Sequence, residues 1–172
     1  MAVIRRERPT DEAAVRSIHC AAFDQGAGEP AEAGLLDGLR ACEGWIPALS
    51  LVVEQHGGSV AGHAVCSRGH VGTVACLGLG PIAVDPARQG TGLGSALMHA
   101  VVGAAEAAGE PLIALLGNPD YYTRFGFVAS SEVSIDAPDP QWGRFFQVRT
   151  LTAWNPSMTG LFRYAEPFQD LD

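Results

Sequence analysis

Three glycines at alternate positions precede a helical pattern in "DPARQGTGLGSALM", residues 85–98. Gly90, Gly92 and Gly94 leave the backbone bare at the point where the helix begins. The first N–H groups of a helix have no partner within it, and the helix dipole favours an anion there. Glycine lets those N–H groups approach an anion with no Cβ in the way. The pattern therefore predicts a phosphate-binding turn. The alternative is a tight turn that needs glycine for a positive φ.

Two common phosphate-binding motifs do not match this turn. A P-loop has Lys followed by Ser or Thr after its last glycine, whereas Ser95 and Ala96 follow Gly94 here. A dinucleotide-binding fingerprint opens a helix, but "GLGPIA", residues 78–83, lies within a predicted strand. An enzyme that acts on a nucleotide phosphate is therefore only a third hypothesis for this chain.

The turn lies at the centre of a predicted strand–turn–helix–strand unit. "VACLGLGPIAV", residues 74–84, is strand-like, although Pro81 has no N–H to give and so indicates an edge, a bulge or a break. Apolar residues spaced i, i+3, i+4 predict a helix over 93–108. The continuous apolar run of residues 111–116 suits a strand buried on both faces.

The remaining pattern predicts a mixed order of helices and strands. A first helix is expected behind an N-cap at Thr10, and a second around Leu35–Leu39. Residues 50–55 and 59–67 flank "HGG", which predicts a hairpin that turns at Gly57–Gly58. Further strands are expected at 3–6, 132–136, 144–151 and 160–164.

Three linked motifs resemble those of the GNAT (Gcn5-related) N-acetyltransferases, which move acetyl from acetyl-CoA to an amine. "QGTGLG", residues 89–94, matches their Gln/Arg-x-x-Gly-x-Gly/Ala signature. "PIAVDP", residues 81–86, resembles their fourth strand. "LLGNPDYYTRFGF", residues 115–127, resembles their fifth strand, fourth helix and Tyr-x-x-x-Gly-Phe ending. The form is most similar to the YhbS-like branch. The similarity is dense over residues 77–127 and weaker outside them.

This resemblance implies a particular fold. We expect an α+β (mixed α/β) architecture with a central, mostly antiparallel twisted sheet, flanked by about four helices. Strands four and five should splay apart, and the break at Pro81 is compatible with that. Residues 1–172 would form a single acetyltransferase domain, with a CoA-binding core at about 77–127 and C-terminal strands at about 128–168.

The resemblance also implies acetyl-CoA as co-substrate and no metal. The turn would wrap the pyrophosphate of CoA, the fourth strand would bind the pantetheine arm, and Arg88 or Arg124 would lie near a peripheral phosphate. Asn118 would contact the cofactor arm, cap the short helix behind it, or do both. The cofactor-binding residues expected from the resemblance are Ile82, Ala83, Val84, Gln89, Gly90, Thr91, Gly92, Leu93, Gly94, Ser95, Asn118 and Phe125.

The implied activity is transfer of acetyl to a primary amine of a small molecule or peptide by direct attack. Tyr122, four residues before Gly126, would give its hydroxyl proton to the leaving thiolate, and Tyr121 is the alternative. A backbone N–H near Ala83 or Val84 would stabilise the oxyanion. A module that binds or senses acyl-CoA without efficient transfer is the competing hypothesis.

The general base and the acceptor pocket are less defined. Many relatives carry a Glu on the fourth strand, but residues 76–84 contain no acid. His63, Glu54, Asp139 and water chains remain open as bases. We expect the acceptor amine to bind between the loops at 24–32 and 136–144, unless these are ordinary solvated loops. Their acidic and aromatic residues include Asp24, Glu29, Asp136, Asp139 and Trp142.

Composition excludes several other classes of protein. The 172 residues are 47% hydrophobic, enough for one domain with a proper core. A net charge of −8 with no basic block makes nucleic acid a poor partner. No apolar run approaches the ~18 residues of a membrane span, and the N-terminus has no signal-peptide pattern. Cys20, Cys42, Cys66 and Cys76 form no CxxC pair, so we expect reduced thiols and a cytoplasmic protein. The resemblance also allows a homodimer.

Overall fold

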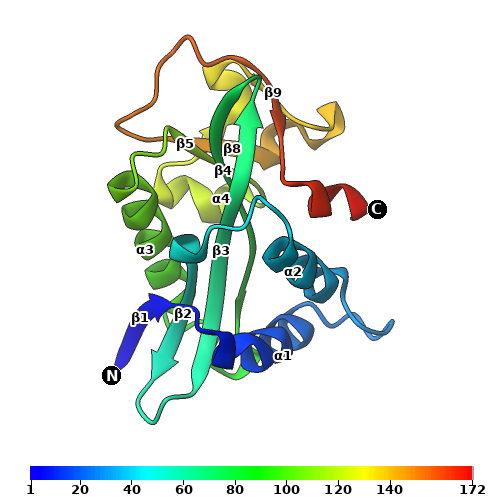
Figure 1. Cartoon of the computed structure of the whole chain (residues 1–172), viewed down its shortest axis with the longest axis vertical. Coiled ribbons are helices and arrows are strands. Elements are labelled where there is room, and N and C mark those ends of the chain that lie inside the picture. The colour runs from blue at the N-terminus through cyan, green and yellow to red at the C-terminus, as the bar shows by residue number, and fades with distance from the viewer. Residues whose placement is uncertain (172) are drawn as a thin grey trace.

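A nine-stranded, mostly antiparallel sheet forms the centre of the protein in the computed structural model, which describes residues 1–171 (Figure 1). Two pairings in it are parallel, β4 with β5 and β7 with β9. Its main path runs through β1 (Ala2–Arg6), β2 (Ser50–Gln55), β3 (Val60–Val71), β4 (Val74–Val84), β5 (Leu112–Leu116), β8 (Phe146–Thr150) and β6 (Val128–Ala129). β7 (Ile135–Asp136) pairs with β9 (Gly160–Arg163), which also pairs with the end of β3.

Strands β4 and β5 separate soon after they meet. They pair only at Leu77 with Ile113 and at Gly78 with Ala114. Beyond Gly78, β4 continues along β3, whereas β5 continues along β8. The backbone of residues 79–84 therefore has no strand on its β5 side. The predicted splay of the fourth and fifth strands is confirmed.

Pro81 lies in a bulge of β4. The register passes from Cys66 opposite Leu79 to Ala64 opposite Ile82, so two residues of β4, Gly80 and Pro81, oppose one residue of β3. A proline has no N–H for a ladder and is tolerated at such a bulge. Of the three alternatives for Pro81, the structure therefore shows the bulge.

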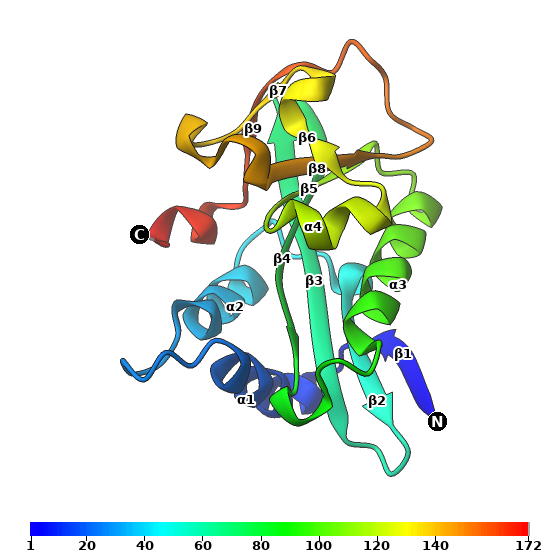
Figure 2. The ribbon, with the colours of Figure 1, turned by 180° about the vertical axis from the view of Figure 1, so that it is seen from behind.

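Helices cover both faces of the sheet (Figures 1 and 2). Helices α1 (Glu12–Ala22) and α2 (Ala31–Ala41) lie on one face, and α3 (Leu93–Ala107) lies on the other. Alternation along β2 serves both faces, because Val52 packs in the core under α1 and α2 while Leu51 and Val53 pack in the core under α3. The short α4 (Pro119–Tyr122) follows β5, so it stands where the two central strands part.

Two predicted details differ from the structure. Thr10 does not cap the first helix: a 3₁₀ turn, Pro9–Asp11, precedes it, and the Asp11 carboxylate accepts the N–H of Arg8 (2.7 Å). The expected strand at 132–136 is also shorter, because Ser130–Val133 form a 3₁₀ turn and only Ile135–Asp136 pair. The hairpin, with positive φ at Gly57 and Gly58, is confirmed.

Within residues 1–171, no helix has both the length and the apolar character to cross a membrane. In the same part of the chain, no three His, Cys, Asp or Glu side chains gather as a metal site. All four cysteines are free thiols: Cys66 and Cys76 are buried, whereas Cys20 and Cys42 are only half-buried.

Candidate active site

The glycine turn between β4 and α3 presents open backbone. Gly90 and Gly92 adopt φ of +74° and +88°, in the left-handed region that favours glycine. A Cβ built on either residue would meet no atom within 4 Å. Both interpretations of the glycines therefore apply: the turn requires a positive φ at Gly90 and Gly92, and the absence of side chains leaves open space in front of it.

Gly94 has a different reason to be glycine. Its φ is ordinary, but a Cβ there would lie 3.0 Å from the hydroxyl of Tyr121. The missing side chain thus makes room for Tyr121 at the start of α3. The turn itself is held by local bonds, since Gln89 donates to the carbonyl of Val84 (3.3 Å) and Thr91 to that of Arg88 (2.5 Å).

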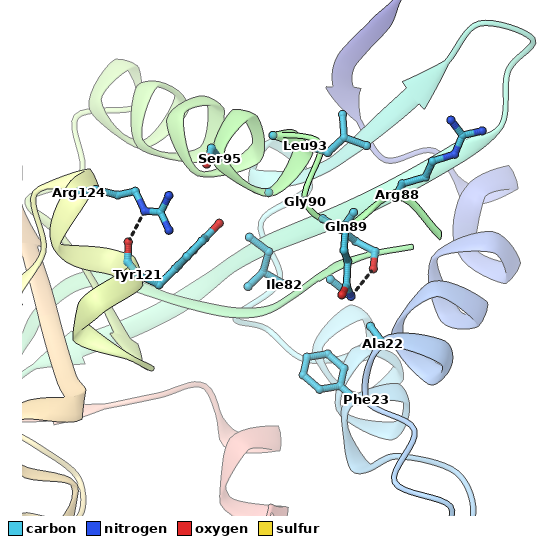
Figure 3. Close-up of a pocket in the computed structure, with 14 residues that line it drawn as sticks. Ala22, Phe23, Ile82, Arg88, Gln89, Gly90, Leu93, Ser95, Tyr121 and Arg124 are labelled. Atoms are coloured by element: carbon cyan, nitrogen blue, oxygen red, sulfur yellow. Dashed lines mark hydrogen bonds between the residues drawn. The ribbon is translucent and has the colours of Figure 1, made fainter. Parts of the chain in front are cut away.

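A cavity of about 530 Å³ lies in front of this turn, and we call it the glycine-turn cavity (Figure 3). Two arginines, Arg88 and Arg124, are the charged side chains that line it among the described residues. The N-terminus of α3 adds the positive end of a helix dipole. Bare amides, a helix start and two cations together suit a phosphorylated ligand. The nine predicted binding residues on its lining are Ile82, Ala83, Val84, Gln89, Gly90, Gly92, Leu93, Gly94 and Ser95.

Three other predicted binding residues do not line this cavity. The hydroxyl of Thr91 is bonded to the carbonyl of Arg88. Asn118 is the N-cap of α4 and accepts the N–H of Asp120 (3.0 Å), which is the structural alternative considered for it. Phe125 is 3% exposed and packs in the core.

Three residues line the cavity without having been assigned to it from the sequence. Ala22 and Phe23, at the end of α1, form the wall opposite the turn (Figure 3). Tyr121 reaches in from α4, and the guanidinium of Arg124 lies 4.3 Å from the centre of its ring. The sequence held a signal for Tyr121 alone, as the neighbour of the motif tyrosine. Phe23 lies about sixty residues before the turn and belongs to no motif.

A second cavity, of about 540 Å³, adjoins the first and opens between the splayed strands. Phe23 and Ile82 line both cavities. Five aromatic side chains contribute to its wall, and Glu32 is its charged side chain among the described residues, so we call it the aromatic cavity. Its aromatic residues are Phe23, Tyr122, Trp142, Tyr164 and Phe168.

Tyr122 lines the aromatic cavity, and its neighbour Tyr121 lines the glycine-turn cavity. Successive helical residues point about 100° apart, which divides the two rings between the two cavities. A Cβ built on Gly117 would lie 2.3 Å from the ring of Tyr122, so the ring rests directly on bare backbone after β5. Burial raises the pKa of Tyr122 to about 12, and the hydroxyl therefore keeps its proton at any working pH.

The structure brings one of the five expected acceptor-loop residues, Trp142, to the aromatic cavity. Asp24 and Glu29 line a separate shallow hollow, where Glu29 pairs with Arg16 (2.5 Å). Asp136 lines another hollow, which shares no lining residue with either cavity. Asp139 caps its own 3₁₀ turn. These four carboxylates therefore fit the alternative interpretation, in which they belong to ordinary solvated loops and do not line the acceptor site.

None of the three candidate bases lines either cavity. Glu54, on β2, pairs with Arg5 (2.5 Å). Asp139 is the turn cap already described. His63, on β3, is fully buried on the face covered by α1 and α2, where it belongs to a polar network. His63 is thus a buried residue of β3 with a structural role in this polar network.

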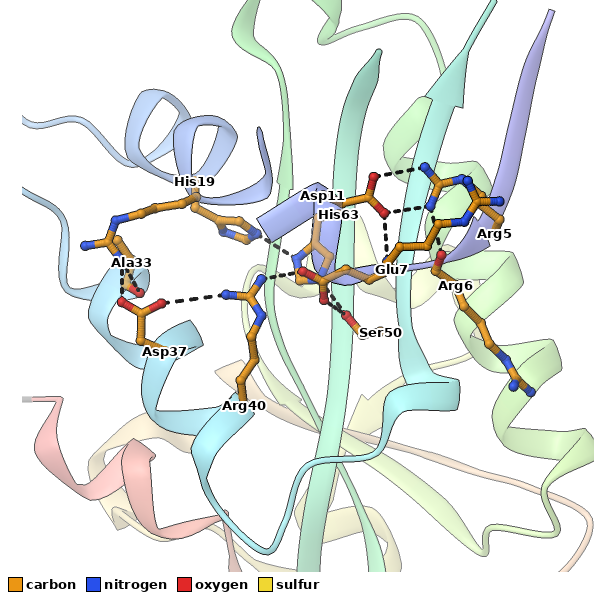
Figure 4. Close-up of polar contacts among 12 residues, drawn as sticks. Arg5, Arg6, Glu7, Asp11, His19, Ala33, Asp37, Arg40, Ser50 and His63 are labelled. Carbon is orange, nitrogen blue, oxygen red and sulfur yellow. Dashed lines mark hydrogen bonds and ion pairs between the residues drawn. The ribbon is translucent and has the colours of Figure 1, made fainter. Parts of the chain in front are cut away.

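The network around His63 fixes the protons of two imidazoles (Figure 4). Ser50 donates its hydroxyl proton to Glu7 (2.5 Å). Its oxygen therefore accepts from Nε2 of His63 (2.8 Å), and the unprotonated Nδ1 accepts from Nε2 of His19 (2.9 Å). Both rings are neutral. Arg40 also pairs with Glu7. The network braces the site from behind, because the ring of His19 stacks on that of Phe23 (5.9 Å between centroids).

This network predicts a loss of stability in mild acid. Burial, and then the nearby His63, lower the pKa of His19 to about 3, well below its ordinary value of 6.5. Between pH 6.5 and pH 3, His19 binds a proton in the unfolded chain but not in the folded protein. The free energy of unfolding therefore falls as the pH drops below about 6.5. One such imidazole costs about 2.5 kcal/mol between pH 7 and pH 4.5. Urea unfolding of the wild type at pH 7 and 4.5 measures the loss.

The matched variant is His19→Gln, whose amide can still donate to His63 but does not titrate. It should lose clearly less stability than the wild type between the two pH values. Equal losses would show that His19 is not the group responsible. Glu7 does not confuse the comparison. Burial would raise its pKa, but the imidazole of His63, 3.5 Å away, and the hydrogen bond from Ser50 hold it at about 2, and the same carboxylate is present in both proteins.

Comparison with known proteins assigns the chain to a family. A model of the acetyltransferase (GNAT) domain matches residues 47–129. The chain is 31% identical over 170 residues to YhbS of Escherichia coli K12, which covers 96% of this chain and 98% of YhbS. It is 30% identical over 166 residues to YjhQ of the same strain, and this alignment covers 92% of this chain and 89% of YjhQ. Both relatives are described as uncharacterized N-acetyltransferases. The chain belongs to the GNAT acetyltransferase family and is an enzyme of that class.

Solved structures agree with this assignment. YhbS from Escherichia coli, in complex with CoA, matches with a TM-score of 0.89 and 29% identity, over 99% of this chain and 93% of that one. A GNAT family acetyltransferase from Brucella melitensis, in complex with acetyl-CoA, matches with a TM-score of 0.79 and 34% identity, over 98% of both. The predicted fold and the predicted YhbS-like branch are confirmed.

Proposed function

We propose that this chain transfers acetyl from acetyl-CoA to a primary amine of a small molecule or peptide. One observation carries the proposal: two cavities of opposite chemistry meet at Phe23 and Ile82. One is lined by bare amides and two arginines, which suits the phosphates of CoA. The other is aromatic with one carboxylate, which suits an amine. Sensing without transfer is not favoured, because Tyr122 stands in the second cavity, beside the gap between strands.

The residues of the glycine-turn cavity fit CoA. Amides from Gly90 to Ser95 would hold the pyrophosphate, in space that any side chain at Gly90 or Gly92 would fill. Arg88 and Arg124 add positive charge. Tyr121, with its hydroxyl near Gly94, closes the cavity on the α4 side. The complexes of YhbS with CoA and of the Brucella melitensis protein with acetyl-CoA support this placement.

The pantetheine arm would lie along the open side of β4. The N–H of Asp85 bonds to the carbonyl of Ala61, the residue opposite it. Backbone groups alternate along a strand, so Ala83 also turns its N–H and carbonyl toward β3, whereas Ile82 and Val84 turn theirs toward the gap. Of the two expected oxyanion donors, the alternation therefore supports the N–H of Val84 over that of Ala83.

Acetyl-CoA supplies the acetyl group as a reactive thioester. In the proposed reaction a neutral amine nitrogen attacks the thioester carbonyl, and the C–N bond forms as the C–S bond breaks. The N–H of Val84 stabilises the oxyanion between these events. The hydroxyl of Tyr122 stabilises the thiolate as it leaves. The proton that finally resides on sulfur is the one that nitrogen loses, so the reaction balances without a further reactant.

Segments from both ends and the middle of the chain contribute to this proposed site. The core at about 77–127 supplies the turn, β4 and α4. Segments outside it supply Phe23, Glu32, Trp142, Tyr164 and Phe168. We therefore propose that residues 1–172 work as one acetyltransferase domain, in which the C-terminal strands at about 128–168 complete the acceptor side.

The test is a titration followed by a turnover assay. Isothermal calorimetry of the purified protein with CoA should show one site per chain, and AMP should bind much more weakly because it lacks the pyrophosphate and the arm. Release of free thiol from acetyl-CoA should then depend on an added primary amine. Absence of CoA binding would reject the proposal. CoA binding with no amine-dependent thiol release, across a broad panel of amines, would favour the sensing module.

A further inference from the structure

We propose that the acceptor is a primary amine carried on an apolar, preferably aromatic, body, and that Glu32 binds its ammonium group. The inference rests on the proposed function and goes beyond it, because it names the class of acceptor and a residue that selects it. It is carried by the walls of the aromatic cavity and by the one charged side chain that the described residues place on them.

The aromatic wall is built from parts of the chain that are far apart in sequence. Phe23 ends α1, Tyr122 ends α4, and Trp142 lies in the 3₁₀ segment Pro140–Phe145. Tyr164 and Phe168, from the C-terminal segment, stack with ring centroids 4.4 Å apart. Aliphatic residues of β4, β5 and α2 fill the spaces between them. Such a surface binds an apolar group of similar size and offers a polar one few partners.

The wall is also rigid on its C-terminal side. A Cβ built on Gly78 would lie 2.6 Å from the ring of Tyr164, so this ring packs directly on the backbone of β4. Burial raises the pKa of Tyr164 far above that of an ordinary phenol. Tyr164 is therefore a neutral, fixed part of the wall. A preformed aromatic surface loses little conformational freedom on binding, which favours flat apolar ligands.

Among the residues that the structure describes, one carboxylate gives this apolar cavity its polarity. Glu32 lies in the first turn of α2, is half-buried, and faces the cavity with Leu35 of the same helix. A carboxylate in apolar surroundings attracts an ammonium group, and aromatic faces add cation–π attraction. The same charge repels a ligand that carries its own carboxylate. A second ammonium group, as in a polyamine, would lose its water in the cavity without gaining a carboxylate partner, so such a ligand should bind poorly.

The occupant that competes with this proposal is a long acyl chain on CoA. An apolar cavity next to the thioester position would also receive such a chain, but the chain would leave Glu32 half-buried beside hydrocarbon. A carboxylate in that position is costly unless it is paired. The charge on the wall therefore favours the amine as occupant, and the test includes the acyl chain as an outcome.

The test compares matched amines in the thiol-release assay with acetyl-CoA. 2-Phenylethylamine carries the expected ammonium and aromatic ring. Ethanolamine lacks the ring, phenylalanine adds a carboxylate, and spermidine adds further charges. We expect kcat/KM for 2-phenylethylamine to exceed that of each of the other three at least tenfold. A preference for ethanolamine or spermidine would overturn the proposal while leaving the transferase function intact.

Variants then assign the selection to Glu32. Glu32→Gln should raise KM for 2-phenylethylamine about fivefold or more, with KM for acetyl-CoA unchanged, and Glu32→Asp should recover part of the loss. The control is Glu29→Gln, three residues away but outside the cavity, which should leave both values unchanged. If Glu32→Gln lowers only thermal stability, Glu32 serves the helix dipole of α2 and the proposal is wrong.

Two further measurements separate this proposal from the proposed function. Calorimetry of the CoA-loaded protein with 2-phenylethylamine should show binding that Glu32→Gln weakens, whether or not turnover occurs. Such binding without turnover would support the acceptor class and reject efficient transfer. Octanoyl-CoA should be a poorer donor than acetyl-CoA. If it is the better donor, and Trp142→Ala removes that advantage, the cavity holds the acyl chain and the acceptor class is rejected.

Discussion

Replacement of Tyr122 by phenylalanine is expected to lower kcat about 100-fold and to leave KM for acetyl-CoA nearly unchanged. The substitution keeps the ring, which packs on Gly117 and pairs edge-on with Phe127 (6.0 Å between centroids). It removes only the hydroxyl of a side chain that lines the aromatic cavity, beside the gap between β4 and β5. A side chain that merely packs would lose little by this change, so the size of the effect decides the role.

The raised pKa of Tyr122 refines how its hydroxyl can act. A phenol of pKa about 12 is a weaker acid than a thiol of pKa about 8.5, so complete proton transfer to the thiolate is uphill. We therefore propose that the hydroxyl stabilises the leaving sulfur as a hydrogen-bond donor, and that the amine supplies the proton that sulfur keeps. The resemblance implies that Tyr122 gives up its own proton, and the raised pKa favours the donor role instead. Loss of one donor to a developing anion typically costs 10²–10³ in rate.

Tyr121→Phe is the paired control, and it should show the opposite pattern. Tyr121 lines the glycine-turn cavity, so loss of its hydroxyl should appear in the KM for acetyl-CoA and hardly in kcat. An acyl donor with a more acidic thiol should partly rescue Tyr122→Phe, because a more stable thiolate needs less help. Near-normal kcat of Tyr122→Phe in single-turnover experiments would show that another group or water assists the sulfur.

Gly92→Val is expected to weaken CoA binding at least tenfold. Two physical effects coincide at this position. The valine side chain would enter the open space in front of the turn, where a Cβ meets no protein atom within 4 Å and where phosphate oxygens are proposed to lie. A β-branched residue at φ +88° is also strained by ~1–2 kcal/mol, which shifts the N–H groups at the start of α3. Calorimetric titration with CoA measures the loss.

A matched variant at the other end of α3 distinguishes the effect of backbone strain from the effect of blocking the phosphate site. Gly109 has φ of +73°, is exposed, and also has no atom within 4 Å of a built Cβ. Gly109→Val should therefore lower the melting temperature about as much as Gly92→Val but leave the affinity for CoA unchanged. If the two variants bind CoA equally well, the glycine turn does not hold the phosphates.

The central unit of the fold could be predicted from the sequence because its signals are local. The glycine turn, the helix behind it and the strand before it each follow from residues within a few positions of one another. The start of α3 at Leu93 agrees with the apolar spacing, and Pro81 marked the bulge that precedes the gap in the sheet. Tyr122 was found for the same reason, since it sits at a fixed distance from Gly126 in one continuous motif.

Several polar residues singled out in the sequence have partners within the protein that the sequence did not indicate, because a residue type does not determine its partner. Asn118 and Asp139 are capping residues in the structure, and Thr91 is bonded within its own turn. His63 belongs to a buried polar network that braces the site from behind. In each case a nearby backbone group or a buried neighbour satisfies the polar atoms, and neither is visible from composition or spacing.

The sequence by itself determined the family, the glycine turn before α3 and the tyrosine motif that ends at Gly126. Only the tertiary structure decided the acceptor side. Phe23, Glu32, Tyr164 and Phe168 meet in one cavity although they are up to about 145 residues apart in the chain. Their meeting depends on helices that pack across the sheet and on the parting of β4 from β5. Contacts of this range follow no sequence period, so the physical reason for the cavity lies in the packing of the whole chain.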